Sequence, residues 1–176
     1  MIRKLMAVDL TPYERRAKEL GHPYLPLREL RGLCAPEGVD IIETLVTLPE
    51  RLPQDDSPEE IARVQHNAIS KKHALQMSGA RIIECPTKRS LSQPSGYKQS
   101  DDARLMLTTL TLALKLRPDF VLLFAADGDF VPMVEMLRAE GIRTEVVASS
   151  DMLASELKRH AVNVVDYDAL LNAIPH

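Results

Sequence analysis

The stretch Phe120-Val-Leu-Leu-Phe-Ala-Ala-Asp-Gly-Asp-Phe-Val-Pro-Met-Val-Glu-Met-Leu-Arg-Ala-Glu-Gly141 decides the fold. Its apolar run from Phe120 to Ala126 predicts a buried strand, and the helical pattern that follows ends at Gly141. Two carboxylates, Asp127 and Asp129, stand where the strand ends and the helix begins. Charge at the end of a buried strand costs folding free energy, so its presence indicates a function. We interpret these residues as ligands of a divalent metal ion used in phosphodiester chemistry.

The rest of the chain continues this alternation of strand and helix patterns. Further strands are predicted at residues 2–10, 39–48, 80–85 and 143–148, with a last short strand at 163–165. Helices are predicted at residues 11–20, 58–78, 101–116, 130–140, 152–160 and 167–173, with a helical turn at 27–33. The capping boxes Thr11-Pro-Tyr-Glu14 and Ser57-Pro-Glu-Glu60 mark two of the helix starts. Residues 86–100, where Pro, Ser, Gly and Gln gather, are predicted to be a flexible loop.

This order of elements predicts a mostly parallel sheet with helices on both faces. The length of 176 residues favours a single domain over residues 1–176, large enough for a substantial core. In such sheets the functional crevice lies beyond the carboxyl ends of the strands. The polar residues at those strand ends are therefore the candidates for function.

Acidic residues from separate segments are predicted to converge at this edge of the sheet. They follow the first strand, open the helix before the decisive stretch, or lie within that stretch: Asp9, Asp101, Asp102, Asp127 and Asp129. Carboxylates at close quarters repel one another and raise each other's pKa unless a cation binds. Their oxygens are the ligands that Mg²⁺ and Mn²⁺ prefer, so we expect one of these ions as the cofactor. An ion held in this way can activate a water and stabilise the leaving oxygen of a phosphodiester.

Each acid also has an ordinary structural explanation. Asp129 is a good N-cap for the helix that follows it, and Asp101 or Asp102 can supply a cap or a favourable first-turn charge. Asp9 could cap the next helix, although Thr11 is already available for that role. The coincidence of all these acids at one edge favours the metal site.

Charge and composition narrow the classes of function. The net charge of −3 argues against a protein that uses its whole surface to bind nucleic acid, but it allows a local basic patch. Cys34 and Cys85 are isolated, which argues against a zinc site and favours a reduced, cytoplasmic setting. The N-terminus has no secretory pattern, and no apolar run approaches the roughly 20 residues that span a bilayer. We therefore expect no membrane association.

A basic segment lies between residues 63 and 98. It contains seven Lys and Arg residues and one Glu, a local charge of +6 in a chain whose net charge is −3. Some of these cations could simply form a solvated helix face. Others flank the predicted loop near the metal site, with an aromatic ring available to stack on a base. We expect these residues to bind the substrate, mainly through phosphate contacts: Lys88, Arg89, Tyr97 and Lys98.

The motifs, taken in order, resemble the NYN family of PIN-like nuclease domains, a LabA-like group. The resemblance rests on Ala7-Val-Asp9, Lys98-Gln-Ser-Asp101 and Leu122-Leu-Phe-Ala-Ala-Asp-Gly-Asp-Phe130, and more loosely on Ser155-Glu-Leu157. These motifs span nearly the whole chain, from about residue 2 to residue 166.

The resemblance implies a Rossmann-like three-layer α/β sandwich with a mostly parallel, five-stranded sheet. It implies a metal-dependent endoribonuclease that cleaves RNA, with single-stranded RNA as the expected substrate. The metal-binding and catalytic roles would belong to Asp9, Asp101, Asp127 and Asp129. Because many related domains pair, a homodimer also fits.

The chain departs from the family pattern in three places. Residues 10–14 lack an Asn, Leu107 and Thr108 stand where a second helical acid is common, and Ala125-Ala126 replaces a small hydroxyl residue. This thinned ligand set favours a second interpretation, a weakened or inactive NYN-fold module that binds RNA or protein. A third interpretation is a phosphohydrolase with a nucleophilic Asp, but the Lys and the Ser or Thr that it needs are not found at convincing positions.

Overall fold

A six-stranded sheet whose neighbouring strands all run parallel forms the centre of the protein, in the order β3-β2-β1-β6-β7-β8. The computed structural model describes residues 1–89, 97–98 and 100–176. The sheet strands are β1 (Ile2–Val8), β2 (Val39–Pro49), β3 (Arg81–Cys85), β6 (Phe120–Phe124), β7 (Arg143–Ala148) and β8 (Asn163–Asp166). The predicted α/β class with a mostly parallel sheet is confirmed.

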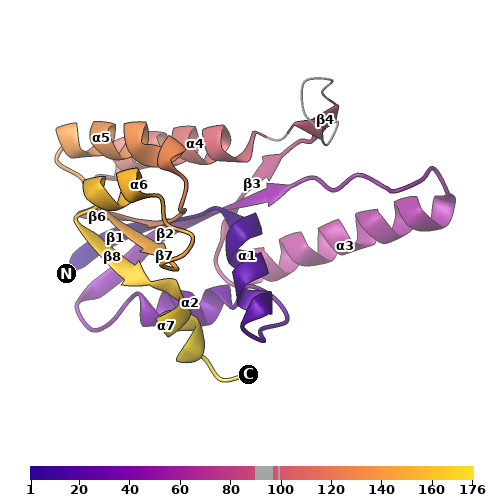
Figure 1. The fold of residues 1–176 in the computed structure, drawn as a ribbon, viewed down its shortest axis with the longest axis horizontal. Helices are drawn as coiled ribbons and strands as arrows, with labels where there is room; N and C mark the ends of the chain where they lie inside the picture. Colours follow the sequence, from indigo (N-terminus) through magenta and orange to yellow (C-terminus); the bar gives the residue numbers. More distant parts are fainter. Residues whose placement is uncertain (90–96, 99) are drawn as a thin grey trace.

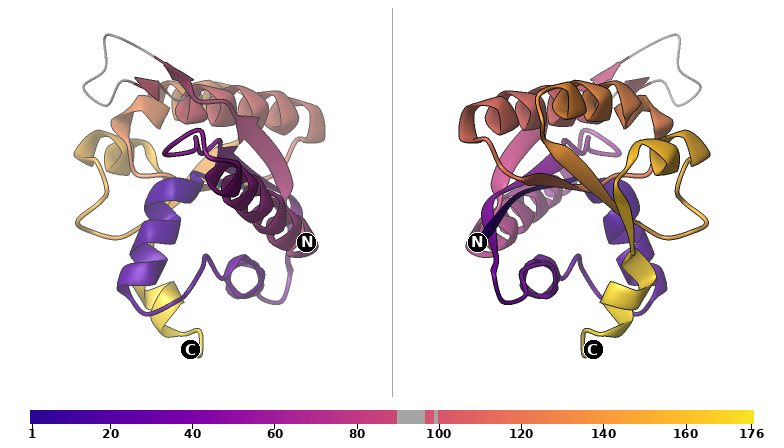
Figure 2. Two further views of the ribbon diagram at one scale, coloured as in Figure 1. Left: turned by 90° about the vertical axis from the view of Figure 1, so that its right-hand side faces the viewer. Right: turned by 90° about the vertical axis from the view of Figure 1, so that its left-hand side faces the viewer.

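The helices cover both faces of the sheet, as Figures 1 and 2 show. One layer contains α4 (Asp101–Leu116), α5 (Val131–Ala139) and α6 (Ser155–His160). The opposite layer contains α1 (Leu10–Glu19), α2 (Leu27–Leu33) and α7 (Tyr167–Asn172). A short 3₁₀ turn, η1 (Gly128–Phe130), leads from β6 into α5.

The alternation of side chains along β1 explains the two layers. Leu5 and Ala7 belong to the core cluster under α4 and α5, whereas Met6 and Val8 belong to the cluster under α1, α2 and α7. All four side chains are fully buried. A strand buried on both faces reads as a continuous apolar run, which is the pattern expected of a central strand in a parallel sheet.

The expectation of five strands is wrong, because the sheet has six. The short stretch predicted at 163–165 is a full member, β8, whose Val164 and Val165 pair with Val146 and Val147 of β7. This strand is only four residues long. The strand predicted from the pattern at 163–165 is thus confirmed, and the count of five strands came only from the family resemblance.

The two predicted capping boxes had different outcomes. Ser57 caps α3 (Pro58–Met77) through its side chain, which accepts a hydrogen bond from the Glu60 N–H at 3.3 Å, so this prediction is confirmed. The Thr11 box is wrong, because α1 begins at Leu10 and Asp9 occupies the N-cap position. The Asp9 side chain makes no capping hydrogen bond, which leaves its carboxylate for another use.

Two parts of the chain extend from the body in Figure 1. The helix α3 projects as an arm, and Leu75 is its only buried residue. Residues 88–89 and 97–98 pair as the antiparallel strands β4 (Lys88–Arg89) and β5 (Tyr97–Lys98). The rest of the predicted flexible loop, residues 90–96 and 99, lies outside the described residues.

Three aromatic rings fasten α1 and α7 to the sheet. The Tyr13 ring lies 5.6 Å from that of Phe124 and 4.8 Å from that of Tyr167, measured between centroids. The Tyr13 hydroxyl donates a hydrogen bond to the Val147 carbonyl, and the Tyr167 hydroxyl donates to the Tyr13 carbonyl at 2.8 Å. Both tyrosine side chains are fully buried, so the hydroxyls are satisfied within the core.

Replacing Tyr13 with Phe should lower the free energy of unfolding by about 1–3 kcal/mol, because the buried Val147 carbonyl loses its donor. Urea unfolding followed by circular dichroism measures this change. The matched control is Tyr24→Phe, since Tyr24 is 62% exposed and its loss of a hydroxyl should have little effect. Equal effects of the two substitutions would contradict the assigned role of the Tyr13 hydroxyl.

Candidate metal centre

The candidate site lies at the carboxyl edge of β1 and β6, in the middle of the sheet. These strands are neighbours in parallel register, with Val8 opposite Phe124. The Asp9 N–H donates to the Phe124 carbonyl at 2.9 Å, so the backbone of Asp9 is fixed beside the end of β6. The packing of two buried strands therefore places Asp9 next to the segment that carries Asp127.

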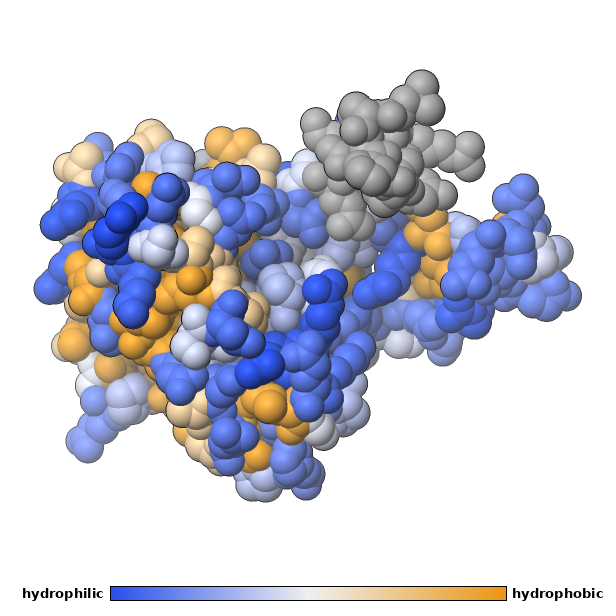
Figure 3. Space-filling view, in the orientation of Figure 1, coloured by the Kyte–Doolittle hydropathy of each residue, from blue (hydrophilic) through white to orange (hydrophobic). Residues whose placement is uncertain are grey.

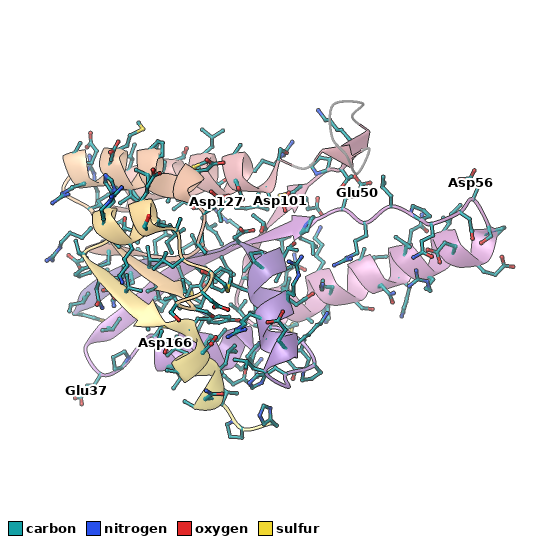
Figure 4. The ribbon with its side chains drawn as sticks, viewed as in Figure 1. Glu37, Glu50, Asp56, Asp101, Asp127 and Asp166 are labelled. Carbon is teal, nitrogen blue, oxygen red and sulfur yellow. The ribbon has the colours of Figure 1, made fainter. Side chains whose placement is uncertain are left out.

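Three carboxylates meet closely at this edge. Asp102, Asp127 and Asp129 each offer one oxygen, and these oxygens all lie within 4.8 Å of one another. Asp102 is in the first turn of α4, and Asp129 is in η1. Figure 4 labels Asp101 at the start of α4 and Asp127 where β6 leads into η1 and α5.

The turn that holds Asp127 is made by its own side chain. Its Oδ1 accepts a hydrogen bond from the Asp129 N–H at 3.0 Å and so caps η1. This bond orients both acids of the Asp-Gly-Asp sequence. The expectation that Asp129 caps the following helix is wrong, because Asp127 caps η1 and the N-cap position of α5 is Phe130, which makes no side-chain capping bond.

Burial and repulsion make three of these acids, Asp9, Asp101 and Asp102, unfavourable as free anions. The pKa of Asp9 is raised from 3.8 to about 7, first by burial and then by the negative charges of Asp102, Asp101 and Asp127. Burial also raises the pKa of Asp101. The pKa of Asp102 is raised by burial and by repulsion from Asp127, Asp101 and Asp129. The folded chain thus concentrates negative charge that a cation would stabilise.

The residues present fit a hard divalent cation. All of the donors are carboxylate oxygens, the type that Mg²⁺ and Mn²⁺ bind. The buried Oδ1 of Asp101 has no hydrogen-bond partner among the described residues. No ion pair within residues 1–89 and 100–176 involves Asp9, Asp101, Asp102, Asp127 or Asp129. Burial raises the pKa of the nearby Cys85 thiol to about 11, so it stays protonated and is a poor metal ligand at neutral pH.

The structure shows which of the acids expected from the sequence lie together. Asp127 and Asp129 lie together, as expected. Asp9 and Asp101 are close enough for their charges to interact, but the closest set takes Asp102 as its third member. Consecutive residues of a helix point about 100° apart, so Asp101 and Asp102 cannot both face η1 in the same way. The sequence showed both acids but not which of them would face η1.

Glu156 is an acid that sequence reasoning did not select. A Cβ on Gly128 would lie 3.3 Å from Glu156 Oε2, so α6 brings this carboxylate against the Asp-Gly-Asp turn. The Ala154 N–H donates to the Ala126 carbonyl at 2.9 Å and holds the two segments together. The loosely matching Ser155-Glu-Leu157 sequence was the only signal. The close approach of Glu156 therefore explains why position 128 is a glycine.

The expected substrate residues lie on the β4–β5 pair. Lys88 is exposed, and the register sets Lys88 opposite Lys98 and Arg89 opposite Tyr97. The side chains of Arg89, Tyr97 and Lys98 lie outside the described residues, so their contacts stay predictions.

Several other cations of the basic segment have carboxylate partners. Lys71 pairs with Glu14 at 2.7 Å and Lys72 with Glu84 at 2.6 Å. Arg63 and Arg81 contact Glu60 and Glu43, which lie outside the segment. The local excess of +6 in the sequence is therefore reduced in the fold. The interpretation of Lys71 and Lys72 as freely solvated cations is also incomplete, because both are paired.

Arg104 is a cation that sequence reasoning missed. It lies one turn after Asp101 on α4, is exposed, and donates to Ser100 Oγ at 3.1 Å. The positive charge of Arg104 lowers the pKa of Cys85, and the negative charge of Asp101 raises it. Arg104 and Asp101 therefore both lie near Cys85, at the edge of the candidate site. Arg104 forms no ion pair with a carboxylate in the part of the chain that the structure describes.

A parallel three-layer α/β fold with carboxylates at its carboxyl edge is the arrangement of the PIN-like nuclease fold. The chain belongs to the NYN domain family, whose family model matches residues 55–168, more than half of the chain. The family expected from the sequence motifs is thus confirmed. The matched region contains Asp102, Asp127 and Asp129, whereas β1 and Asp9 precede it.

A solved structure with a TM-score above 0.5 supports the fold. The chain is similar to a protein of unknown function from Vibrio parahaemolyticus, with a TM-score of 0.68 and 17% identity over 93% of this chain and 91% of that chain. It also matches MurG of Acinetobacter baumannii, with a TM-score of 0.48 and 13% identity over 93% of this chain and 41% of that chain. No curated protein matches the chain. Among the described residues, no helix is long and apolar enough to cross a membrane.

The raised pKa of Asp9 has a testable consequence for stability. Its folded pKa of about 7 lies above the reference value of 3.8, so folding disfavours the charged form. The stability of the metal-free protein should therefore fall as the pH rises from about 4 to about 7. Asp9→Asn should stabilise the protein in chelator at pH 8, by an amount on the order of 2 kcal/mol, and much less at acidic pH.

Thermal melts in chelator at both pH values measure this difference. Asp56→Asn is the matched control, because Asp56 is exposed at the tip of the arm in Figure 4. If Asp9→Asn raised the melting temperature equally at acidic and alkaline pH, the charge of Asp9 would not be what destabilises the metal-free protein.

Proposed function

We propose that this protein is a metal-dependent endoribonuclease that hydrolyses phosphodiester bonds of single-stranded RNA with Mg²⁺ or Mn²⁺. The observation that carries the proposal is the meeting of Asp102, Asp127 and Asp129 within 4.8 Å, beside a half-buried Asp9, in a member of the NYN family. Structural acids are usually paired with cations or caps. Apart from the cap made by Asp127, these have no such partner among the described residues.

In this proposal the metal ligands are the four acids expected from the sequence and one added from the geometry. The expected acids are Asp9, Asp101, Asp127 and Asp129, and the added one is Asp102. A bound divalent ion would lower the pKa of a water and stabilise the charge that develops on the phosphate oxygens. Asp127 and Asp129 are held by the capping bond of η1, which preorganises their oxygens. One of these carboxylates would also orient the attacking water.

The RNA backbone would leave the metal site across the ends of β2 and β3. Arg51, Lys88 and Arg104 are exposed cations along this rim, and none of them forms an ion pair with a carboxylate of the described residues. The strand pairing brings the Lys98 and Tyr97 positions to the same ribbon as Lys88. Cations beside an acidic metal site hold phosphates without neutralising the site itself.

The remaining elements of the proposal follow from the same site. All of its acids come from one chain, so the reaction requires no second subunit. Cys34 and Cys85 are free thiols, which suits the cytoplasm, where they would stay reduced.

The second candidate is an inactive NYN-fold module that binds RNA or protein. One observation favours it. Where a second helical acid is common in the family, this chain has Leu107, which is 67% exposed, and Thr108, which is half-buried. Neither side chain supplies a carboxylate. Such a module would keep its partner when the acids are changed.

Cleavage of a labelled single-stranded RNA should require Mn²⁺ and stop in chelator. Asp127→Asn should reduce the rate by roughly a hundredfold or more, because it removes a charge from the metal site. The Asn side chain can still accept the Asp129 N–H bond, so the turn is kept. Asp56→Asn is the control, and the same RNA annealed to its complement tests the preference for single strands.

The result that would overturn the endoribonuclease is RNA binding without cleavage, unchanged in Asp127→Asn. That outcome would support the binding module. Loss of cleavage in both Asp127→Asn and Asp56→Asn would instead point to general damage to the protein.

Arg104→Ala should weaken RNA binding and lower the slope of log affinity against log salt by about 0.7, the value for one phosphate contact on a single strand. Fluorescence anisotropy at several salt concentrations measures both quantities. Arg138→Ala is the matched control, because Arg138 is exposed in the last turn of α5, away from the site. An unchanged salt slope in Arg104→Ala would remove this residue from the binding surface.

A further inference from the structure

We propose that a pocket beside α1 binds a guanine base of the RNA strand. The pocket has a volume of about 220 Å³. Its lining comes from α1 and from the connection between β7 and α6: Pro12, Arg15, Arg16, Glu19, Asp151 and Met152. Sites for drug-sized ligands have volumes of roughly 300–1,000 Å³, so this pocket suits a single ring system. The choice of RNA as the source of the base rests on the proposed function.

The α1 wall of the pocket is fixed before any ligand binds. Its four lining residues are three or four positions apart, so their side chains lie on one side of the helix. Arg16 is held there by Asp168, whose carboxylate accepts hydrogen bonds from Nε at 3.0 Å and from Nη2. The Ser149 hydroxyl donates to the same carboxylate at 2.6 Å, which ties this pair to the end of β7. Figure 3 shows a strongly hydrophilic surface over α1.

Both walls of the pocket are joined to the metal site. Two residues after Met152, the Ala154 N–H donates to the Ala126 carbonyl at 2.9 Å, and Ala126 directly precedes the Asp-Gly-Asp turn. On the other wall, Pro12 follows Asp9 by three residues, which is less than one turn of helix. A base in this pocket would therefore belong to a nucleotide near the phosphate at the metal site.

Three charged groups of the lining remain available to a ligand. The Asp151 side chain is 65% exposed, and its only ion pair among the described residues is with Arg16 Nη1 at 3.8 Å, too long for a hydrogen bond. Glu19 uses one oxygen, Oε2, to accept from Arg16 at 3.1 Å. Arg15 is exposed and forms no ion pair within residues 1–89 and 100–176. The pocket thus offers carboxylates that only accept hydrogen bonds and a guanidinium that only donates them.

Guanine is the base that can satisfy both kinds of group. Its N1–H and N2–H₂ are neighbouring donors that a carboxylate accepts, and its O6 and N7 are the acceptors to which Arg most often binds. Uracil has a single N–H donor between two carbonyl oxygens, which carboxylates repel. Adenine and cytosine each present one amino group beside a ring acceptor. The carboxylates of Asp151 and Glu19, together with the Arg15 guanidinium, therefore favour guanine over the other bases.

The rest of the lining suits the flat faces of a base. The Arg16 side chain is 23% exposed, although Asp168 and Glu19 occupy the edges of its guanidinium. The face of the guanidinium plane is therefore the part left for a base to stack on. Pro12 and Met152 add apolar surface, and a thioether packs favourably against an aromatic ring.

Titration calorimetry with guanosine 5′-monophosphate in chelator tests the pocket without any cleavage. This nucleotide should bind roughly tenfold more tightly than adenosine 5′-monophosphate, the discrimination expected of one bidentate contact. Asp151→Ala should bind the two nucleotides equally, because it removes an acceptor for the guanine donors. Asp56→Ala is the matched control, since Asp56 is exposed at the tip of the arm, and it should keep the preference. Circular dichroism checks that both variants fold.

Competition identifies the source of the base. A short single-stranded RNA with one central guanine should displace guanosine 5′-monophosphate better than the same strand with a central adenine. Guanosine 5′-monophosphate that binds but is displaced by neither strand would overturn the assignment to RNA. Equal affinity for the two mononucleotides, or a preference that survives in Asp151→Ala, would overturn the guanine pocket itself.

These measurements separate the pocket from the proposed reaction, because they involve neither metal nor cleavage. A protein that prefers guanine in both assays but does not cut RNA would contradict only the endoribonuclease. A protein that cuts RNA but binds the two mononucleotides equally would contradict only the guanine pocket.

Discussion

Repulsion between carboxylates at the carboxyl edge of the sheet is the constraint on which the site depends. Asp9, Asp102 and Asp127 raise the free energy of the folded state when all are charged and no cation is present. The carboxylates stay close to one another because the buried apolar strands that carry them are packed side by side. Leu5, Ala7 and Leu123 are fully buried, so β1 and β6 cannot separate without exposing the core.

The strand order is what converts distant sequence positions into one site. β1 pairs with β2 on one side and with β6 on the other, although more than a hundred residues separate β1 from β6. The parallel register sets the ends of β1 and β6 side by side, with Val8 opposite Phe124. Since α4 returns over β1 and β2, its first turn arrives at the same edge. Topology thus fixes which acids meet, and the local turns fix how they point.

Much of this could be predicted from sequence, because the signals were local. The apolar run from Phe120, the cap at Ser57 and the helix at 101–116 each depend on residues that are near one another in the chain. The short strand predicted at 163–165 is present as β8, so the wrong count of five strands came from the family resemblance and not from the local pattern. The choice of Asp102 over Asp101 in the closest set depends on how α4 is rotated about its axis. That rotation is set by Leu105 in the core, together with contacts across the sheet.

Rotation about the axis of α4 also separates the environments of its side chains. Its first turn points Asp102 at η1, its underside packs Leu105 and Ala113 on the sheet, and its outer side carries Leu107. Positions about 100° apart on a helix have separate environments although they are neighbours in sequence. A substitution at Leu107 should therefore leave the carboxylates in place, whereas one at Leu105 would move them, because the buried side sets the position of the first turn. The acidic end and the outer side of this helix can vary independently as long as the side on the sheet is kept.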